Sequence, residues 1–293
     1  MRVVVTGARG QLGAAIVHEF CSAHEVTALG REQLDVTDDA AVAEKMDALH
    51  PDAIVNTAAY NDVDGAEDHP VEALNGNAFA VRALARAAER AGSALVHYST
   101  DFVFDGMTTK PYTEDDKPNP RSVYAASKLL GEWFAGDTSR RYVLRVESLF
   151  GHAPGGPKPR GSISAMLNGF ASRGEVRAFE DRTVSPTYIS DAARATRQLL
   201  EQRAQPGLYH CVNTGECTWL EFARELARQL GTEPRIVPVR MADATLRAQR
   251  PRYCALSNEK LRSAGVSMPA WQDALARYLQ SVRDDLAHQV PYR

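Results

Sequence analysis

The sequence predicts an α/β protein: a Rossmann-type, doubly wound parallel sheet with a smaller C-terminal α/β substrate domain. Three observations predict this fold. A β-branched run at residues 2–6 is followed at once by a glycine-rich turn and an apolar helical pattern. Further short apolar runs alternate with helical patterns in βα units of about 20 to 35 residues. A Gly- and Pro-rich stretch at 152–161 separates a dinucleotide-binding domain, 1–151, from a mainly substrate-binding domain, 152–293, some elements of which can return to the first sheet.

Composition places the chain among ordinary globular proteins. Of its 293 residues, 44% are hydrophobic and 24% charged, enough for a sizeable core. The formal net charge of -3 gives no basic field for nucleic acid or anionic membrane, and no run of about 18 apolar residues predicts a membrane helix. No signal-peptide pattern precedes the first strand, and the cysteines and histidines show no metal-ligand spacing. We expect a cytoplasmic monomer or homodimer that binds no metal, nucleic acid or membrane.

The first βα unit carries a phosphate-binding pattern. After the predicted strand at 2–6, Gly7, Gly10 and Gly13 follow in GxxGxxG spacing at the start of a helical pattern. Glycines let the backbone approach a pyrophosphate, and a helix N-terminus offers free N–H groups and a partial positive charge. A plain glycine-rich turn is the alternative, but the position directly after a first strand favours dinucleotide binding.

The end of the second predicted strand, 24–29, bears on the choice of cofactor. A site for NAD has an acidic residue there to bind the ribose 2′-hydroxyl. This chain has Gly30 and Arg31 instead, and a guanidinium can bind a 2′-phosphate, although a solvated loop charge is the alternative. We expect NADPH as the cofactor, with NADH possible. Thr37 is the expected N-cap of a helix at 38–49.

Hydroxyl groups follow a later strand, 93–98, where open α/β sheets bind their ligands. Ser99, Thr100 and Asp101 stand at its carboxyl end. A hydroxyl there can donate a hydrogen bond to a carbonyl or hydroxyl of the substrate. Ordinary strand-end turn chemistry is the alternative, because turns favour the same residue types.

The candidate general acid lies on the next helix. Ser122 stands near the start of this helix, and Tyr124 and Lys128 are four residues apart, which places their Cβ atoms about 5–6 Å apart on one face. A tyrosine hydroxyl titrates near ~10 in isolation, and a neighbouring cation lowers its pKa. The pair therefore predicts general acid–base chemistry, although a chance pairing is the alternative when the motif is taken alone.

The remaining elements follow from apolar periodicity and capping residues. Thr218 opens a capping box, and Ser190 is the expected cap of the helix that follows it. The other predicted strands are 51–56, 142–146, 176–179 and 207–212, and the other predicted helices are 70–91, 162–173, 191–202, 219–230, 258–264 and 270–288.

Taken together, these motifs resemble the extended short-chain dehydrogenase/reductases and, within them, the dTDP-4-dehydrorhamnose reductase family. The resemblance runs in the family's order over nearly the whole chain, so it is far more specific than any one motif. The stretches that carry it are residues 5–13, 34–37, 56–60, 97–104, 185–187 and 250–251, together with Tyr124 and Lys128.

The resemblance implies that NADPH or NADH reduces the 4-keto group of a nucleotide-linked 6-deoxy sugar. In family terms, Tyr124 protonates the carbonyl oxygen, Lys128 holds the nicotinamide ribose and lowers the tyrosine pKa, and Thr100 orients the carbonyl. Residues implied to face the substrate are Thr100, Asp101 and Thr187. Residues implied to line the cofactor are Gly10, Gln11, Leu12, Asp35, Val36, Ala58, Ala59, Tyr60 and Tyr98.

Four residues refine these expectations. Ser148 stands where family members commonly carry a tryptophan over the sugar, so we expect an altered preference among nucleotide sugars. Arg250 is expected to bind a nucleotide phosphate in a bidentate way, with a surface salt bridge as the alternative. Gly76 lies inside a predicted helix, at a cost of about 1 kcal/mol relative to alanine. Asn77 beside it either faces solvent or bonds the backbone of a neighbouring loop.

Two other classes of function remain open from the sequence. One is a nucleotide-sugar epimerase or dehydratase of the same superfamily, which keeps its cofactor bound through a cycle. The other is a non-catalytic subunit resembling the regulatory subunit of methionine adenosyltransferase. The presence of Thr100, Tyr124 and Lys128 together favours chemistry.

Overall fold

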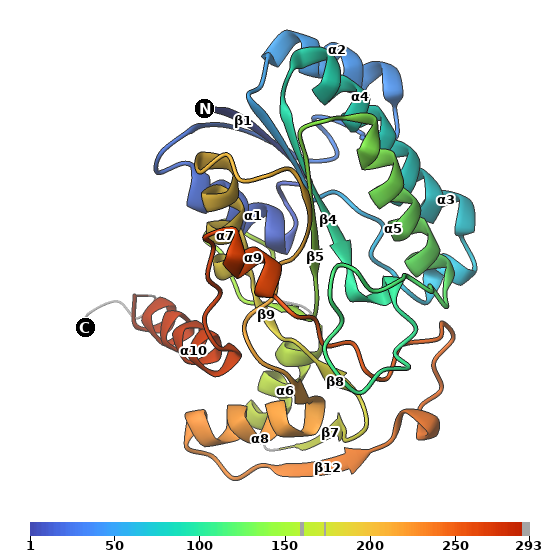
Figure 1. Cartoon of the computed structure of the whole chain (residues 1–293). Helices are drawn as coiled ribbons and strands as arrows, with labels where there is room; N and C mark the ends of the chain where they lie inside the picture. The colour runs from blue at the N-terminus through green and yellow to red at the C-terminus, as the bar shows by residue number, and fades with distance from the viewer. Residues whose placement is uncertain (159–160, 173, 289–293) are drawn as a thin grey trace.

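The computed structural model describes residues 1–158, 161–172 and 174–288 (Figure 1). Its main feature is a parallel six-stranded sheet with the order β10-β5-β4-β3-β1-β2. The predicted doubly wound parallel sheet is confirmed. Its strands are β1 (Arg2–Thr6), β2 (Glu25–Leu29), β3 (Ala53–Asn56), β4 (Ala94–Thr100), β5 (Arg141–Val146) and β10 (Gly207–His210).

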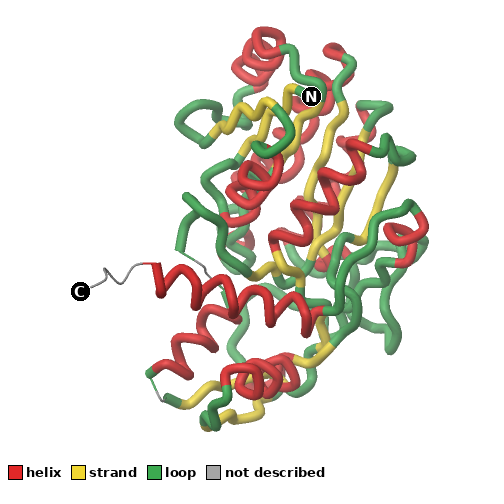
Figure 2. Tube along the Cα trace, turned by 90° about the vertical axis from the view of Figure 1, so that its left-hand side faces the viewer, coloured by secondary structure: helices red, strands yellow, loops and turns green. Residues whose placement is uncertain are grey.

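Helices cover both faces of this sheet, because successive apolar side chains of each strand point to opposite sides. Val3 and Val5 pack with α1 (Gln11–Phe20) and α7 (Ile189–Glu201), whereas Val4 packs on the other face. That face is covered by α2 (Asp39–Leu49), α4 (Ala80–Ala91) and α5 (Val123–Phe134). Figure 2 shows the strands from the α1 side, with a helix crossing in front of them.

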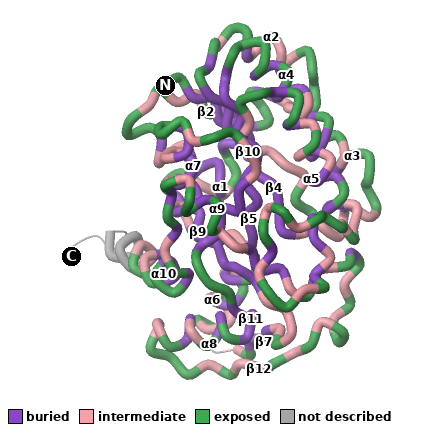
Figure 3. The backbone as a smooth tube through the Cα atoms, viewed as in Figure 1, coloured by how far each residue is buried: buried purple, intermediate pink, exposed green. Residues whose placement is uncertain are grey.

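The chain changes direction across the sheet between β1 and β3. Strand β2 pairs with one side of β1 and strand β3 with the other. The segments that follow β1 and β3 therefore leave neighbouring strand ends in different directions. Such a switch point leaves a crevice outside the carboxyl ends of the strands, where ligands bind. The glycine turn, the segment after β3 and the end of β4 all lie along this edge. Strands β4 and β5, whose carboxyl ends form part of this edge, are buried (Figure 3).

A smaller group of elements lies below the carboxyl ends of β4 and β5 in Figure 1. Its strands form three two-stranded pairings. They are β7 (Glu175–Phe179) with β12 (Arg235–Val239), β8 (Thr183–Val184) with β11 (Cys217–Thr218), and β6 (Leu149–Phe150) with β9 (Thr187–Tyr188). The helices here are α6 (Ser162–Ala171), α8 (Trp219–Leu230) and α10 (Trp271–His288), whereas α9 (Glu259–Ser263) packs beside β10 of the large sheet. Strand β10 and helix α7, although both follow residue 152, pack into the large sheet layer.

The predicted single helix 70–91 is interrupted. It begins as α3 (Pro70–Leu74), widens into a π-helical turn at Asn75–Phe79 and continues as α4. Gly76 and Asn77 therefore lie in the π turn, and Asn77 is fully buried. Its side chain bonds the backbone of a neighbouring loop, which was one of the two alternatives for this residue.

Two predicted helix caps are wrong. The N-cap of α2 is Asp38, whose carboxylate accepts from the first-turn N–H groups, while Thr37 bonds Asp35. Helix α7 already begins at Ile189, so Ser190 lies inside it. Strand β12 was not predicted, because Pro238 interrupts its apolar run and such a residue is typical of an edge strand. Among the described residues, no helix is both long and apolar enough to cross a membrane.

Candidate active site

Helix α5 places the two residues of the tyrosine–lysine pair on its buried face. Ser122 caps the helix by accepting a hydrogen bond from the Ala125 N–H at 3.2 Å, as its position near the helix start suggested. Tyr124 and Lys128 are both buried, Lys128 with only 3% of its surface exposed. The helix packs against β4 and the short turn after it, so both side chains reach the carboxyl edge of the sheet.

The Tyr124 phenol lies at the end of β4. It shares a hydrogen bond with the Thr100 hydroxyl, and the ring meets Phe102 edge-on with centroids 5.7 Å apart. Burial, reinforced by the negative charge of Asp101, raises the pKa of Tyr124. The structure therefore brings Thr100 and Tyr124 together as predicted, and it keeps the phenol protonated at neutral pH.

The expected effect of Lys128 on that pKa is wrong in this structure. The Lys128 ammonium donates a 2.6 Å hydrogen bond to the Tyr98 carbonyl, and burial lowers the pKa of Lys128 to about 8 while Glu132 opposes the shift. The cation is thus held by the backbone of β4, so burial and Asp101 decide the pKa of the phenol. Tyr98 reaches the site through its carbonyl, because its hydroxyl contacts Thr196 of α7 at 2.5 Å.

A buried ion pair beneath Lys128 was missed by the sequence analysis. The Arg145 guanidinium is bidentate on Glu132, at 2.8 Å from Nε and 2.7 Å from Nη2. Ser99 donates to the same carboxylate at 2.5 Å, so this strand-end hydroxyl supports Glu132 and does not face a ligand. The only sequence signal was an arginine within the buried strand β5, since such a charge needs a partner.

The glycine turn after β1 fits a dinucleotide. Gly7 has φ 67°, and an added Cβ would lie 2.5 Å from the Ala58 backbone nitrogen. A Cβ on Gly13 would lie 2.3 Å from the Gly7 carbonyl oxygen. The backbone segments after β1 and β3 therefore meet without side chains between them. Gly10 has no side chain to cap α1, so the first N–H groups of this helix suit a pyrophosphate.

Other predicted cofactor residues line the same edge. Gln11 donates from its amide to the Gly151 carbonyl at 2.8 Å, which ties the start of α1 to the segment after β5. Asn77 accepts from the Tyr60 N–H at 2.8 Å, donates to the Tyr60 carbonyl at 3.0 Å and also donates to Ser127 on α5. This one side chain fixes the loop after β3 relative to the helix that carries Tyr124 and Lys128.

Arg31 stands free enough to bind a ligand. Its side chain is 88% exposed after β2, with the nearest carboxylate oxygen, that of Asp35, 3.5 Å from Nε. Thr37 donates to Asp35 through both its N–H and its hydroxyl, and these bonds lower the pKa of the Asp35 carboxyl. Asp35 is therefore ionised and held in place beside the arginine.

The predicted substrate residues come from several elements. Thr187 is fully buried in β9, where its N–H faces the Ser148 carbonyl at 3.4 Å. Ser148 adopts φ 47°, a left-handed conformation unusual for a residue other than glycine. The Asp101 side chain is buried and accepts from the Thr100 hydroxyl at 2.9 Å.

Arg250 is held by a carboxylate in this structure. Its guanidinium makes bidentate contacts with Asp64, at 3.0 Å from Nη1 and 2.8 Å from Nη2. These bonds hold the pKa of Asp64 at about 2. A phosphate would have to displace Asp64 to use this guanidinium, so the salt bridge that the sequence left open is the arrangement present.

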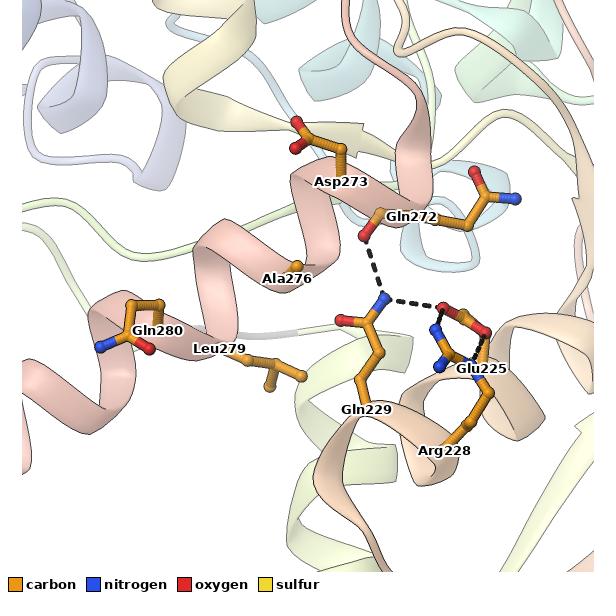
Figure 4. Close-up of a pocket in the computed structure, with 8 residues that line it drawn as sticks. All are labelled: Glu225, Arg228, Gln229, Gln272, Asp273, Ala276, Leu279 and Gln280. Atoms are coloured by element: carbon orange, nitrogen blue, oxygen red, sulfur yellow. Dashed lines mark hydrogen bonds and ion pairs between the residues drawn. The ribbon is translucent and has the colours of Figure 1, made fainter.

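A hollow of about 480 Å³ lies away from these residues, between α8 and α10 (Figure 4). None of the residues predicted for the site lines it. Glu225 on its wall accepts hydrogen bonds from Arg228 and Gln229, and Gln229 also donates to the Gln272 carbonyl. The carboxylate, the guanidinium and the amide nitrogen are thus bonded to one another or to the backbone, and Gln229 Oε1 is left without a hydrogen-bond partner, so the hollow offers no constellation comparable to Thr100 and Tyr124.

Comparison with known proteins agrees with this geometry. The family model described as RmlD substrate binding domain matches residues 1–284. A dTDP-4-dehydrorhamnose reductase of Mycobacterium tuberculosis is 36% identical over 286 residues, which cover 95% of this chain and 92% of that protein. The spore coat polysaccharide biosynthesis protein SpsK of Bacillus subtilis is 35% identical over 281 residues, 95% of this chain and 97% of the relative.

Solved structures extend the likeness. A dTDP-4-dehydrorhamnose reductase of Bacillus anthracis in complex with NADP has a TM-score of 0.90 at 31% identity, covering 96% of this chain and 99% of that one. The UDP-glucose 4-epimerase of Thermus thermophilus, at 22% identity and a TM-score of 0.79, shares the fold. The resemblance expected from the sequence is confirmed: the chain belongs to the RmlD substrate-binding domain family, and its similarity to dTDP-4-dehydrorhamnose reductases extends over nearly its whole length.

Proposed function

We propose that this chain reduces the 4-keto group of a nucleotide-linked deoxy sugar, with NADPH as the preferred hydride donor and NADH as a possible one. One observation carries the proposal. Thr100, Tyr124 and Lys128 converge on the same sheet edge as the glycine turn, whose crowded backbone fits a pyrophosphate. The named reductases among its relatives support the same reaction.

The chain's own residues supply the proton and the orientation. NADPH, when bound, supplies the hydride. Tyr124, kept protonated by its raised pKa, gives its phenolic proton to the carbonyl oxygen as that oxygen gains negative charge. Thr100 orients the carbonyl by its hydroxyl. We assign Lys128, which the Tyr98 carbonyl holds in place and which is charged below its pKa of about 8, to the nicotinamide ribose.

The sugar should bind between the carboxyl ends of the strands and the smaller group of elements. We divide the chain at residue 151 accordingly, into a dinucleotide-binding domain, 1–151, and a mainly substrate-binding domain, 152–293. Ser148 lies at the junction and provides less apolar surface than an aromatic side chain. We therefore expect dTDP-4-dehydrorhamnose to be a poorer substrate than another 4-keto nucleotide sugar. Cytoplasmic location and the monomeric or homodimeric state stay predictions.

The test is NADPH oxidation with a panel of 4-keto nucleotide sugars. Wild type should consume NADPH stoichiometrically with one of them, which an epimerase would not do. Tyr124→Phe should lower turnover by about 10²–10⁴-fold while NADPH still binds. Tyr142→Phe is the matched control, because its hydroxyl donates to the Ala204 carbonyl away from the site. Normal turnover by Tyr124→Phe would exclude the acid role, and a panel with no turnover and no binding would exclude the substrate class.

The same panel tests Arg250. Arg250→Ala should weaken nucleotide-sugar binding, whereas Asp64→Asn, which releases the guanidinium from its carboxylate, should strengthen it. Calorimetric titration measures both. Equal affinities for wild type and both variants would mean that Arg250 serves only the salt bridge. If the protein turns over dTDP-4-dehydrorhamnose as fast as its best alternative, the expected change in substrate preference is contradicted.

A further inference from the structure

Two buried carboxyl groups face each other behind Thr100. Asp101 opens the short turn after β4 and Glu147 directly follows β5, and each is only 2% exposed. One oxygen of each carboxyl group and the sulfur of Cys254 all lie within 4.8 Å of one another. Neither Asp101 Oδ2 nor Glu147 Oε1 has an N–H or O–H donor, and the weak S–H donor of Cys254 can serve only one of the two carboxyls at a time. A buried oxygen without a donor is costly, so this pair of oxygens calls for a proton between them.

The charges around the pair lead to the same conclusion. Arg182 is the cation that acts on both carboxyls, and its guanidinium also reaches Cys254 at 3.9 Å. The other titratable groups that act on Glu147 or feel its charge are the Cys254 thiol, the Cys217 thiol and the Tyr253 phenol; burial raises the pKa of each, so they stay neutral. One guanidinium balances one carboxylate. The second carboxyl therefore keeps its proton in this dry environment.

Glu147 is the group that keeps it. Burial and the neighbouring Asp101 raise the pKa of Glu147 well above its usual range, whereas Arg182 and the Thr100 hydroxyl limit the rise at Asp101 to about 6. Near neutral pH, Asp101 is thus mainly a carboxylate and Glu147 a carboxylic acid. The same three ligand atoms do not suit a divalent cation, because Arg182 already supplies the positive charge.

A hydrogen-bonded path runs from the phenol to Asp101, the neighbour of this acid. Thr100 Oγ1 donates to Asp101 Oδ1 at 2.9 Å, and the Tyr124 phenol shares a hydrogen bond with Thr100. Glu147 itself is fixed from the other side, where the Ser185 N–H donates to Oε2 at 2.7 Å. Its free oxygen is left on the side of Asp101. Hydrogen bonds therefore join Tyr124, Thr100 and Asp101, and a Glu147 carboxyl oxygen lies within 4.8 Å of one of Asp101 at the end of this row.

We propose that Glu147 is the proton reservoir of the active site, and that Asp101 and Thr100 pass its proton to Tyr124 after each reduction. The inference rests on the proposed function, in which Tyr124 gives up its phenolic proton. Glu147 loses its acid O–H proton to the Asp101 carboxylate. The Asp101 carboxyl group then turns to bring this proton to Thr100. The phenolate takes the Thr100 hydroxyl proton while Thr100 takes the one from Asp101, which returns to a carboxylate. Glu147 regains its proton from solvent between turnovers, so one solvent proton enters per turnover.

The first test is the pH dependence of turnover in Glu147→Gln, which keeps the side-chain shape and an acceptor for the Ser185 N–H. With the reservoir removed, only Asp101 can hold a proton, and its pKa is about 6. Turnover should fall roughly 10²-fold below wild type at about pH 8 and approach wild type at about pH 5.5, with KM unchanged. Glu89→Gln, at the end of α4 beside Thr138 and Ser139, is the matched control and should keep the wild-type profile. Parallel profiles for Glu147→Gln and wild type would overturn the proposal.

The second test needs no turnover, and its first measurement uses the wild-type protein alone. Infrared spectra of the wild-type protein should contain the carbonyl stretch of a protonated carboxylic acid at about pH 8, far above the usual carboxyl range. That band should disappear in Glu147→Gln and persist in Glu89→Gln. A wild-type spectrum without the band would overturn the reservoir even if the enzyme is active. A band present in a protein that reduces no nucleotide sugar would instead overturn the proposed function, and with it the use of the proton in catalysis.

Discussion

Replacing Glu132 by a neutral residue tests how much the buried Arg145–Glu132 ion pair stabilises the protein. The side chains of Arg145 and Glu132 are only 2% and 8% exposed, and the carboxylate accepts two hydrogen bonds from the guanidinium and one from Ser99. Glu132→Gln keeps the shape but leaves Arg145 as a buried cation with an NH₂ group facing one of its donors. Removing one partner of such a pair costs about 3–5 kcal/mol.

The structure argues for the lower end of that range. The Arg145 guanidinium also lies 4.9 Å from the centroid of the Phe104 ring, and this cation–π contact survives the substitution. We therefore expect the free energy of unfolding to fall by about 3 kcal/mol, a large part of the roughly 5–15 kcal/mol of a typical protein. Glu132 also raises the pKa of Lys128, so the charge on Lys128 should be lost at a lower pH in the variant.

Urea unfolding followed by circular dichroism and by tryptophan fluorescence measures the loss. Glu259→Gln is the matched control, because its ion pair with Arg262 is exposed, with 72% and 65% of the side chains accessible. That change should cost at most about 0.5 kcal/mol. If Glu132→Gln cost no more than Glu259→Gln, the buried pair would contribute nothing beyond an exposed one and the reasoning would be refuted.

Three further predictions concern the cofactor edge. Arg31→Ala should weaken NADPH binding more than NADH binding, since only the former carries a 2′-phosphate; equal losses in fluorescence titrations would leave Arg31 a surface charge. Gly13→Ala should destabilise by about 1–3 kcal/mol and weaken NADPH binding, because backbone must move to admit the methyl group, whereas Gly136→Ala, with nothing within 4 Å, should be neutral in thermal unfolding. Because burial lowers the pKa of Lys128 to about 8, the unfolded chain binds more protons than the folded protein between about pH 8 and 10. The free energy of unfolding of wild type should therefore rise by about 1–3 kcal/mol relative to that of Lys128→Met as the pH increases through that window. Parallel stability curves for the two proteins would contradict the shift.

The sequence predicted the parts of the fold that depend on local patterns. Runs such as residues 2–6 and 93–98 are apolar on both faces, which is typical of a buried parallel strand, and the structure places both in the sheet. Helix caps are harder to predict, because several consecutive residues can accept hydrogen bonds from the same first-turn N–H groups. Asp38 replaced Thr37 as a cap for this reason.

Features that depend on distant partners were beyond the sequence. Tyr124 and Lys128 were predicted from their spacing, but the direction of the phenol pKa shift depends on the burial of that group and on Asp101. The pairing of Arg250 with Asp64 joins residues 186 positions apart, and no periodicity encodes it. Glu147 drew no attention in the sequence because a single acid after a strand is common; only its burial distinguishes it.

The π-helical turn at Asn75–Phe79 has a consequence for insertions and deletions. A π turn holds about one residue more than an α turn, so removing one residue here would let the helix close into regular α geometry. Everything before it would then rotate by about 100° relative to α4, and Asn77 would leave the Tyr60 backbone and Ser127. The length of this segment is therefore as constrained as its composition. Aligned relatives that keep the loop after β3 should show no gap between residues 75 and 79.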